Sequence, residues 1–372
     1  MFRKLLILSL FVLLPLSIAS EDTLALQLFR SVVKEQAGHN IVFSPVGVEH
    51  CLEQLKEGTA GESARELQNL RLGKPFSTDG TNITPKMSSA TFADEVLELQ
   101  PGTSHIQRIP LSTNRQKALS FINNWCSDAT QGRIRNLLSG DELSENSRLL
   151  LINTILLNEP WQNAFHADST DEDTFTRGDG STIRVNMMNS GETAFRAAGG
   201  KNWRAVALPY SKADSAERPF YFVAILPRAD AQGFAQHLTQ QKLDIILRKL
   251  ADDEEEGIRC TVRLPRFSAH GRFCNLTPTL QKIGLKHIFT TEADFSPWSK
   301  TPGLRLTAVC QKACVEVQEH GTIAAAASYA EMDEEGENIQ EQIVFNRPFL
   351  WLICELSPAG SPLFMGLWEG TE

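Results

Sequence analysis

Residues 319–335 read EHGTIAAAASYAEMDEE, and this stretch decides how the rest of the chain is interpreted. If it is a strand, its side chains alternate between two faces. One face then carries only small, uncharged side chains before Met332, namely Thr322, Ala324, Ala326, Ser328 and Ala330. The other face starts with Gly321 and becomes acidic toward residue 335. Taken alone, a stretch so rich in alanine and so poor in turn formers favours a helix, so both states stay open at this point.

The flanking segments favour the strand. Residues 304–317 (LRLTAVCQKACVEV) alternate as a strand does and run directly into residues 318–322. Downstream, residues 344–353 and 361–366 read as two short buried strands before the C-terminus. The stretch is therefore predicted to be an extended segment between strands, with the face of Thr322 able to pack inside a sheet.

This order of segments resembles the end of the serpin family, whose reactive-centre loop lies at this place. Further motifs follow in family order through most of the chain: 40–45 (NIVFSP), 58–61, 130–134, Asn153 with Trp161, 185–188, 208–210, 225–227, 264–267 and 293–296. Each motif is weak alone, but their joint order is specific. The resemblance implies an α+β serpin fold, a single domain with large mixed or antiparallel sheets, surrounding helices and an exposed reactive-centre loop at about residues 319–343.

The N-terminus predicts secretion. Arg3 and Lys4 precede an apolar run at residues 5–18, and small residues follow up to position 19. This is the pattern of a signal peptide over residues 1–19, and the run is too short to span a bilayer. The alternative is a signal anchor that stays in the membrane. We expect a serpin domain at residues 20–372, found in the extracellular space.

Composition limits the partners. Loss of Arg3 and Lys4 lowers the net charge from −9 to −11, and no Lys/Arg stripe remains that would bind nucleic acid or an anionic membrane. The clustered basic face of glycosaminoglycan-dependent serpins is also missing, so we expect no such binding. A hydrophobic content of 42% without a Pro/Gly/Ser-rich linker indicates one large domain, which we expect to be a monomer.

Two kinds of residue bear on processing. The sequons at Asn82 and Asn275 are candidate glycosylation sites, although proline directly follows the threonine in both. The seven cysteines are odd in number, so at least one is free or pairs with another chain. Cys310 and Cys314 are interpreted as small buried hydrophobic residues.

The sequence does not predict an enzyme. It lacks the Gly-x-Ser-x-Gly, His-Glu-x-x-His, Walker and Gly-x-Gly-x-x-Gly motifs. Its eight histidines are scattered, and no Cys/His pair has the spacing of metal ligands. The acidic runs 171–173 and 252–256 are interpreted as solvated loops. We expect no metal and no cofactor.

The resemblance implies a suicide-substrate mechanism. A protease attacks the loop and forms an acyl-enzyme, and the cut loop inserts into the main sheet and distorts the protease. A charge or proline at Thr322 would block insertion. Fourteen inserted residues, 322–335, would gain ladder hydrogen bonds worth about 1 kcal/mol each, on the order of 10 kcal/mol together. The expected hinge residues are Glu319, Gly321, Thr322, Ala324, Ala325, Ala326, Ala327 and Ser328. The expected sheet-opening region is Asn40, Ser44, Asn153 and Gln311.

Three departures from the family pattern bear on this mechanism. Ile323 stands where glutamate is usual, and it should point outward. Gln311 stands where many serpins have histidine, which changes the polar cluster where the sheet opens. Residues 74–114 are several tens fewer than usual, so one helix, commonly the heparin-binding one, is expected to be lost or shortened. Residues 90–97 are expected to keep a strand.

Distance from the hinge gives Glu335-Gly336 as the scissile bond, whereas counting back from Phe345 gives Glu337-Asn338. Either bond has an acidic specificity residue. The carboxylate at the base of a trypsin-like pocket would repel it, and a chymotrypsin-like pocket would bury it unpaired. We therefore expect an acid-preferring serine-type protease with a basic S1 pocket. The alternatives are a non-inhibitory binding, carrier or storage protein, and a plain substrate cut at Tyr329 or Met332.

Overall fold

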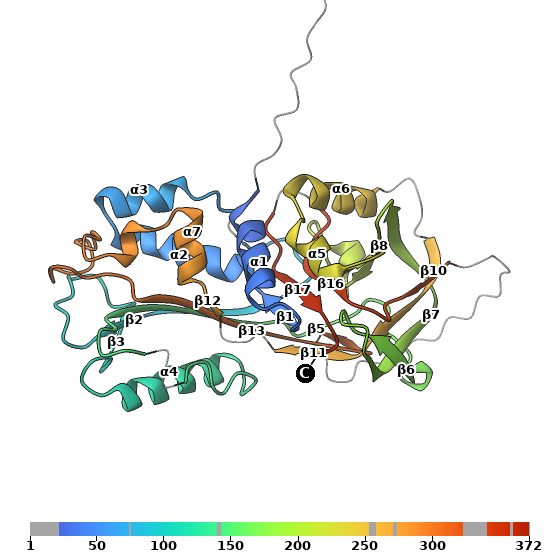
Figure 1. Cartoon of the computed structure of the whole chain (residues 1–372), viewed down its shortest axis with the longest axis horizontal. Helices are drawn as coiled ribbons and strands as arrows, with labels where there is room; N and C mark the ends of the chain where they lie inside the picture. Colours follow the sequence, from blue (N-terminus) through green and yellow to red (C-terminus); the bar gives the residue numbers. More distant parts are fainter. Residues whose placement is uncertain are drawn as a thin grey trace, which may run out of the picture.

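The computed structural model describes residues 22–73, 76–139, 143–252, 258–270, 274–322, 341–357 and 360–371. These residues form two sheets and a set of helices (Figure 1). The helices are α1 (Leu24–Glu35), α2 (Pro45–Gly58), α3 (Gly61–Asn69), α4 (Arg115–Ala129), α5 (Ala231–Gln236), α6 (Gln240–Ala251) and α7 (Thr277–Ile283), with 3-10 turns at Ala167–Ser169, Ala213–Ser215 and His287–Phe289. The expected α+β fold is confirmed.

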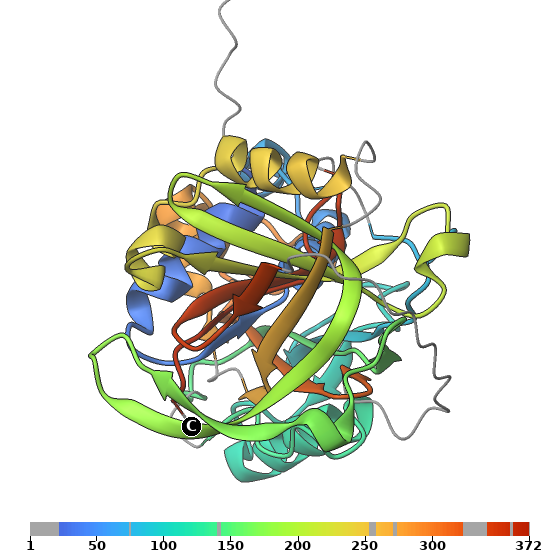
Figure 2. The same cartoon turned by 90° about the vertical axis from the view of Figure 1, so that its right-hand side faces the viewer.

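The first sheet joins the two ends of the chain. Its strand order is β1 (Ile41–Phe43), β17 (Phe364–Trp368), β16 (Phe349–Glu355), β9 (Phe220–Pro227), β8 (Trp203–Pro209), β7 (Thr182–Gly200), β10 (Ile258–Pro265) and β15 (Glu341–Val344), and β6 (Asp171–Thr176) pairs with β7. Figure 2 shows these strongly twisted strands from one end of the molecule. β1 pairs with β17 in antiparallel register, Val42 opposite Gly366.

The second sheet contains the site. Its order is β3 (Gln107–Ile109), β2 (Lys86–Asp94), β4 (Leu149–Leu156), β13 (Ala308–Gln318), β14 (Gly321–Thr322) and β5 (Glu159–Pro160), while β11 (Phe267–His270) and β12 (Cys274–Asn275) pair with β13. Its two central strands, β4 and β13, are parallel over Leu150–Leu156 and Ala308–Cys314. We call this pairing the β4–β13 seam.

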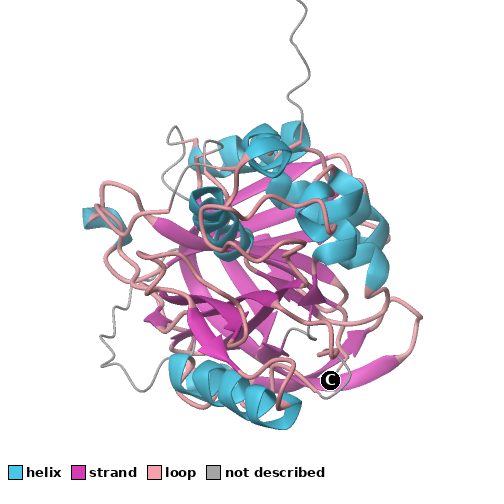
Figure 3. Cartoon of the chain, turned by 90° about the vertical axis from the view of Figure 1, so that its left-hand side faces the viewer, coloured by secondary structure: helices cyan, strands magenta, loops and turns pink. Residues whose placement is uncertain are grey.

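The second sheet is covered on both faces. In Figures 1 and 3 most helices lie on one side of it, and α4 lies alone on the other. Apolar residues of α4, such as Leu119 and Ile122, are buried against Phe92 and Ile152 of the sheet. A larger core, which includes Phe29, joins α1 and α2 to the opposite face. Because the sheet is covered on both faces, every residue of β4 is buried, and its sequence LLLINTIL is apolar except at Asn153 and Thr154 rather than alternating.

The structure tests several sequence-based expectations. The segment 304–317 is a strand, but it starts at Ala308 and ends at Gln318. No helix occurs within residues 76–114, and β2 keeps the strand expected near residues 90–97. The interpretation of residues 171–173 as a loop was wrong, because they begin β6, where the carboxylate of Asp173 pairs with Arg263 at 3.1 Å. Of the run 252–256, only Asp252 lies within the described residues.

Candidate functional site

The chain reverses direction at the end of β13 and starts a new strand. After Gln318, residues 319–320 form a turn, and Gly321–Thr322 return as β14. β14 is antiparallel to β13, with Thr322 opposite Val317, and antiparallel to β5, with Thr322 opposite Glu159. We call residues 319–322 the hinge. Its last two residues already lie between two strands of the sheet, directly beyond the end of the seam.

The side chain of Thr322 is completely buried. Its Oγ1 lies 2.7 Å from the hydroxyl of Tyr210, which is also fully buried and whose pKa is raised by that burial. Trp161 stacks on Tyr210 with 4.9 Å between ring centroids, and its Nε1 donates a hydrogen bond to the carbonyl of Gln318 at 2.8 Å. These two aromatic residues therefore hold both ends of the hinge turn.

Glu319 is anchored by a second set of contacts. Its Oε1 accepts hydrogen bonds from the Arg266 guanidinium and from Oγ1 of Thr170, the latter at 2.9 Å. Burial alone would raise the pKa of Glu319, but the hydrogen bonds from Arg266 and Thr170 hold it below its usual value. Backbone bonds complete the anchor, since the amide nitrogens of Trp161 and Phe165 donate to the carbonyls of His320 and Glu319 at 3.0 and 2.8 Å.

Three of the four residues expected in the sheet-opening region meet at the seam. Asn153 of β4 and Gln311 of β13 are register partners, and Nε2 of Gln311 donates to Oδ1 of Asn153 at 2.9 Å. The same Nε2 donates to the carbonyl of Ser44, whose backbone nitrogen donates to Oε1 of Gln311, both at 2.8 Å. Gln311 thus ties both central strands to the N-terminus of α2. A Cβ on Gly47 would lie 2.1 Å from Oδ1 of Asn153, so this helix approaches the seam closely enough to require glycine.

The fourth residue, Asn40, lies elsewhere. Its Oδ1 accepts from the backbone nitrogen of Glu369 at 2.8 Å, and its Nδ2 donates to the carbonyl of Thr371. Asn40 therefore fastens the C-terminal segment and is not part of the seam cluster. The physical reason is that β1, which follows Asn40, pairs with β17 and so brings the C-terminus to it.

On the opposite face of the seam, the segment after α4 is bonded to β13. Nζ of Lys312 donates to the carbonyl of Asn136 at 2.8 Å, and Arg133 forms an ion pair with Glu316. Both strand residues belong to β13. Any opening of the seam on this side must accommodate these contacts.

The remaining predicted site residues belong to the rest of the reactive-centre loop and to the two sequons. Ala324, Ala325, Ala326, Ala327, Ser328, Glu335 and Gly336 lie outside the described residues. Nδ2 of Asn82 donates to the carbonyls of Tyr210 and Ser211 at 3.0 and 3.2 Å, so a glycan on this nitrogen would displace at least one bond. Asn275 is exposed, and only its Oδ1 is used, accepting from the nitrogen of Thr277 at 3.0 Å.

The described residues are further characterised by their buried cysteines, by the lack of a metal site and by the lack of a membrane-spanning helix. The six cysteines with described side chains are all buried, including Cys310 and Cys314 as expected. Within the described ranges, no His/Cys/Asp/Glu group could hold a metal ion. The described helices also include none with the length and apolar character needed to cross a membrane.

Sequence reasoning assigned no role to Tyr210 or Arg266, although both lie in motifs that it singled out. Each is a polar residue directly after an apolar strand end, in 208–210 (LPY) and 264–267 (LPRF). That position, where a strand leaves the core, is the only sequence signal they carry. Their partners in the hinge lie 112 and 53 positions away in the sequence.

Comparison with known proteins agrees with this geometry. Plasminogen activator inhibitor 1 of Neovison vison is 27% identical, with 91% of this chain and 89% of that protein aligned. Serpin I2 of Homo sapiens is 27% identical over 88% of this chain and 85% of that protein. The crystal structure of native protease nexin-1 with heparin superposes with a TM-score of 0.78 at 22% identity, covering 93% of this chain and 97% of the other.

A family model described as Serpin (serine protease inhibitor) matches residues 19–90 and 86–369, which is nearly the whole chain. Members of this family are protease inhibitors and not enzymes, in agreement with the sequence-based expectation. With the two sheets, the hinge and the seam described above, the chain belongs to the serpin family.

Proposed function

We propose that this protein is a secreted suicide-substrate inhibitor that traps a serine-type protease by inserting its reactive-centre loop into the second sheet. Residues 1–19 are the signal peptide in this proposal, residues 20–372 the serpin domain, and residues 319–343 the loop. The main support for the proposal is the position of Thr322. Its side chain is buried between β13 and β5, and β14, which ends at Thr322, runs in the direction of the seam.

The direction of β14 supports insertion. β14 runs antiparallel to β13 and to β5, and β4 and β13 run parallel to each other. A strand that continued β14 through the seam would be antiparallel to both neighbours. One parallel interface would then become two antiparallel ones, and antiparallel pairing is slightly more stable per residue. The added ladder of residues 322–335 supplies the larger part of the gain.

In the trapping reaction the serine oxygen of the protease attacks the carbonyl carbon of Glu335. The peptide bond to Gly336 breaks, the amine of Gly336 leaves with a proton, and an ester joins Glu335 to the protease. Insertion of residues 322–335 then moves the ester away before water hydrolyses it. The protease is one that accepts an acidic residue, with a basic S1 pocket.

The relatives support inhibition in general and not this specificity. The name of plasminogen activator inhibitor 1 states that it is an inhibitor, and the family description states serine protease inhibition. Protease nexin-1 was solved with heparin, but the net charge of −11 that we expect for residues 20–372 leads us to propose no such cofactor here.

The test is incubation of residues 20–372 with a Glu-specific serine protease, read by SDS gel and intact mass. The expected product is an SDS-stable adduct carrying the cleaved chain up to Glu335. Thr322→Arg would place a charge at the first inserted position, so it should be cleaved without forming the adduct. Thr322→Val, which keeps the shape, should still form it.

The outcomes separate the candidate functions. An adduct that ends at Glu337 would keep the mechanism and move the scissile bond. Cleavage without an adduct and without a rise in melting temperature would refute the inhibitory proposal and favour a non-inhibitory binding protein.

A further inference from the structure

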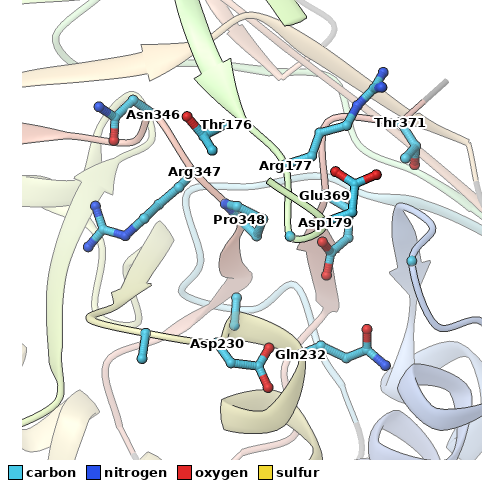
Figure 4. Close-up of a pocket in the computed structure, with 14 residues that line it drawn as sticks. Thr176, Arg177, Asp179, Asp230, Gln232, Asn346, Arg347, Pro348, Glu369 and Thr371 are labelled. Carbon is cyan, nitrogen blue, oxygen red and sulfur yellow. The ribbon is translucent and has the colours of Figure 1, made fainter. Parts of the chain in front are cut away.

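A cavity of about 840 Å³ opens away from the hinge and the seam. Five segments surround it: the turn between α1 and β1, the turn between β6 and β7, the start of α5, the segment after β15 and the C-terminal segment after β17 (Figure 4). Its lining includes Arg177, Asp179, Asp230, Arg347 and Glu369. This volume is within the range of small-molecule sites. No residue of its lining takes part in the inhibitory mechanism proposed above.

Glu369 is the most unusual residue in this cavity. It is only 4% exposed, yet its carboxylate makes no hydrogen bond or ion pair with the described part of the chain. A Cβ on Gly178 would lie 3.0 Å from Oε2 of Glu369, so the turn backbone packs directly over the carboxylate. Burial, followed by the charges of Asp230 and Asp179, raises the pKa of Glu369 to about 7. A buried carboxylate without a partner needs an explanation, since burying an unpaired charge is costly.

The arginines of the cavity do not neutralise this carboxylate. Nε of Arg177 donates to the carbonyl of Gly370 at 2.9 Å, and Nη2 of Arg347 donates to the carbonyl of Pro227 at 3.1 Å. Neither forms an ion pair with an acidic residue that the structure describes. In Figure 4 Arg347 lies at the left of the view, whereas Arg177, Glu369 and Asp179 lie together on the right. The hydrogen bonds from Ser181, and then the charge of Arg177, lower the pKa of Asp179. Glu369, by contrast, faces the cavity without an ion pair to a described cation.

The spacing of the acidic side chains around the cavity favours an extended organic cation over a metal ion as its ligand. Asp179 and Asp230 are near enough to raise the pKa of Glu369. No three acidic, histidine or cysteine side chains of the described residues converge closely enough to hold a metal ion. Oδ2 of Asp230 accepts from the nitrogen of Gly233 at 2.9 Å as the cap of α5, which leaves its second oxygen for another donor. Separated carboxylates around one cavity match separated ammonium groups on one flexible ligand.

We propose that this cavity binds a small linear polyamine, with one ammonium group on Glu369 and others on Asp230 and Asp179. Ammonium groups supply several hydrogen-bond donors each and no acceptor, which suits the unpartnered carboxylate of Glu369 and the remaining acceptor capacity of Asp230 and Asp179. The aliphatic linkers of a polyamine bridge the gaps between the three acids. Binding requires the ionised form of Glu369, so affinity rises as the pH rises through about 7, while the amines stay protonated.

The experiment is isothermal titration of residues 20–372 with spermidine in low-salt buffer at pH 8. We expect saturable binding that weakens at least tenfold in Glu369→Gln, and at least tenfold in the unchanged protein at pH 5.5. The matched control is Glu145→Gln, an exposed position outside the cavity with the same change in net charge. It should bind spermidine as the unchanged protein does, which separates the site from general attraction to an acidic protein.

A second variant covers the case in which Glu369→Gln fails to fold. Asp179 is exposed, so Asp179→Asn should fold normally and weaken binding about threefold. The proposal is overturned if the titration shows no saturable heat of binding, or if Glu369→Gln binds spermidine as tightly as Glu145→Gln does. It is also overturned if MgCl₂ displaces spermidine as well as the diamine putrescine does at the same ionic strength. None of these variants is expected to lose protease inhibition. A failure of the polyamine proposal would therefore leave the inhibitory proposal intact, and the reverse also holds.

Discussion

The hydroxyl of Tyr210 and Oγ1 of Thr322 lie 2.7 Å apart, and neither residue has any exposed surface. Because both partners are buried, each satisfies a group that would otherwise have lost its bond to water. This contact connects the first sheet, in which β8 leads to Tyr210, to β14 of the second sheet.

Tyr210→Phe should release the hinge. The variant leaves Oγ1 of Thr322 buried without a partner, at a cost of about 1–3 kcal/mol. We expect the melting temperature to fall by about 2–4 °C and limited proteolysis of the loop to become faster. The double variant Tyr210→Phe/Thr322→Val removes both polar groups and should recover most of the stability. If the single variant is as stable as the unchanged protein, the contact does not hold the hinge.

Glu319→Gln should weaken the same turn by a different route. It removes the charge that Arg266 and Thr170 bind, and we expect a loss of about 1 kcal/mol because Arg266 is partly exposed. The pKa of Glu319 is lowered, so its contribution is present above pH 4.5 and lost as the pH falls below that value. Urea unfolding of both proteins at pH 7 and pH 3 measures this, and an equal difference at both pH values would contradict it.

Glu49→Gln should stabilise the protein at high pH. Burial raises the pKa of Glu49 to about 7, although Gly73 and Ser361 donate hydrogen bonds to it. The contribution of Glu49 to stability is therefore most favourable below pH 4.5 and falls by up to about 3 kcal/mol as the pH rises to 7. Gln cannot ionise and its oxygen accepts the same bonds, so the variant should gain stability at pH 8 relative to pH 4. The exposed Glu57, which is not among the groups that shift the pKa of Glu49, supplies the control Glu57→Gln, which should show no such gain.

Glycosylation should occur at Asn275 and not at Asn82. The amide of Asn82 donates two backbone hydrogen bonds and accepts one from the nitrogen of Phe220 at 2.8 Å, whereas Nδ2 of Asn275 donates to no residue that the structure describes. Peptide mapping of the secreted protein after enzymatic deglycosylation reads the two sites directly. A glycan at Asn82 would mean that modification precedes the formation of these bonds.

The sequence predicted the strands around the hinge because their patterns are local. β2 and β13 were predicted to within four residues of their observed bounds from alternation and from order within the family. Gln311 was also expected at the sheet-opening region from the family resemblance, and strand register places it beside Asn153. Asn40 was placed there with Ser44 through the family motif 40–45, but the pairing of β1 with β17 takes it to the C-terminus.

The through-space contacts could not be derived in this way. Nothing in 208–210 or 264–267 shows that Tyr210 and Arg266 reach the hinge, because that depends on how β8 and β11 are positioned relative to β13. The buried carboxylate of Glu369 carries no sequence signal either. It lies four residues after Met365, near the end of an apolar strand, where an acidic residue normally reaches water.

The pairing of β1 with β17 also governs when the protein can finish folding. A ribosome makes the chain from the N-terminus, so β1 is synthesised long before its partner β17 emerges. β4 likewise waits for β13, with an apolar edge that has unpaired backbone groups. Such distant pairings slow folding and prolong exposure to aggregation. Translation therefore leaves the second sheet open until Ala308–Gln318 emerges and the first sheet open until Phe364–Trp368 emerges, and both edges need protection for that period.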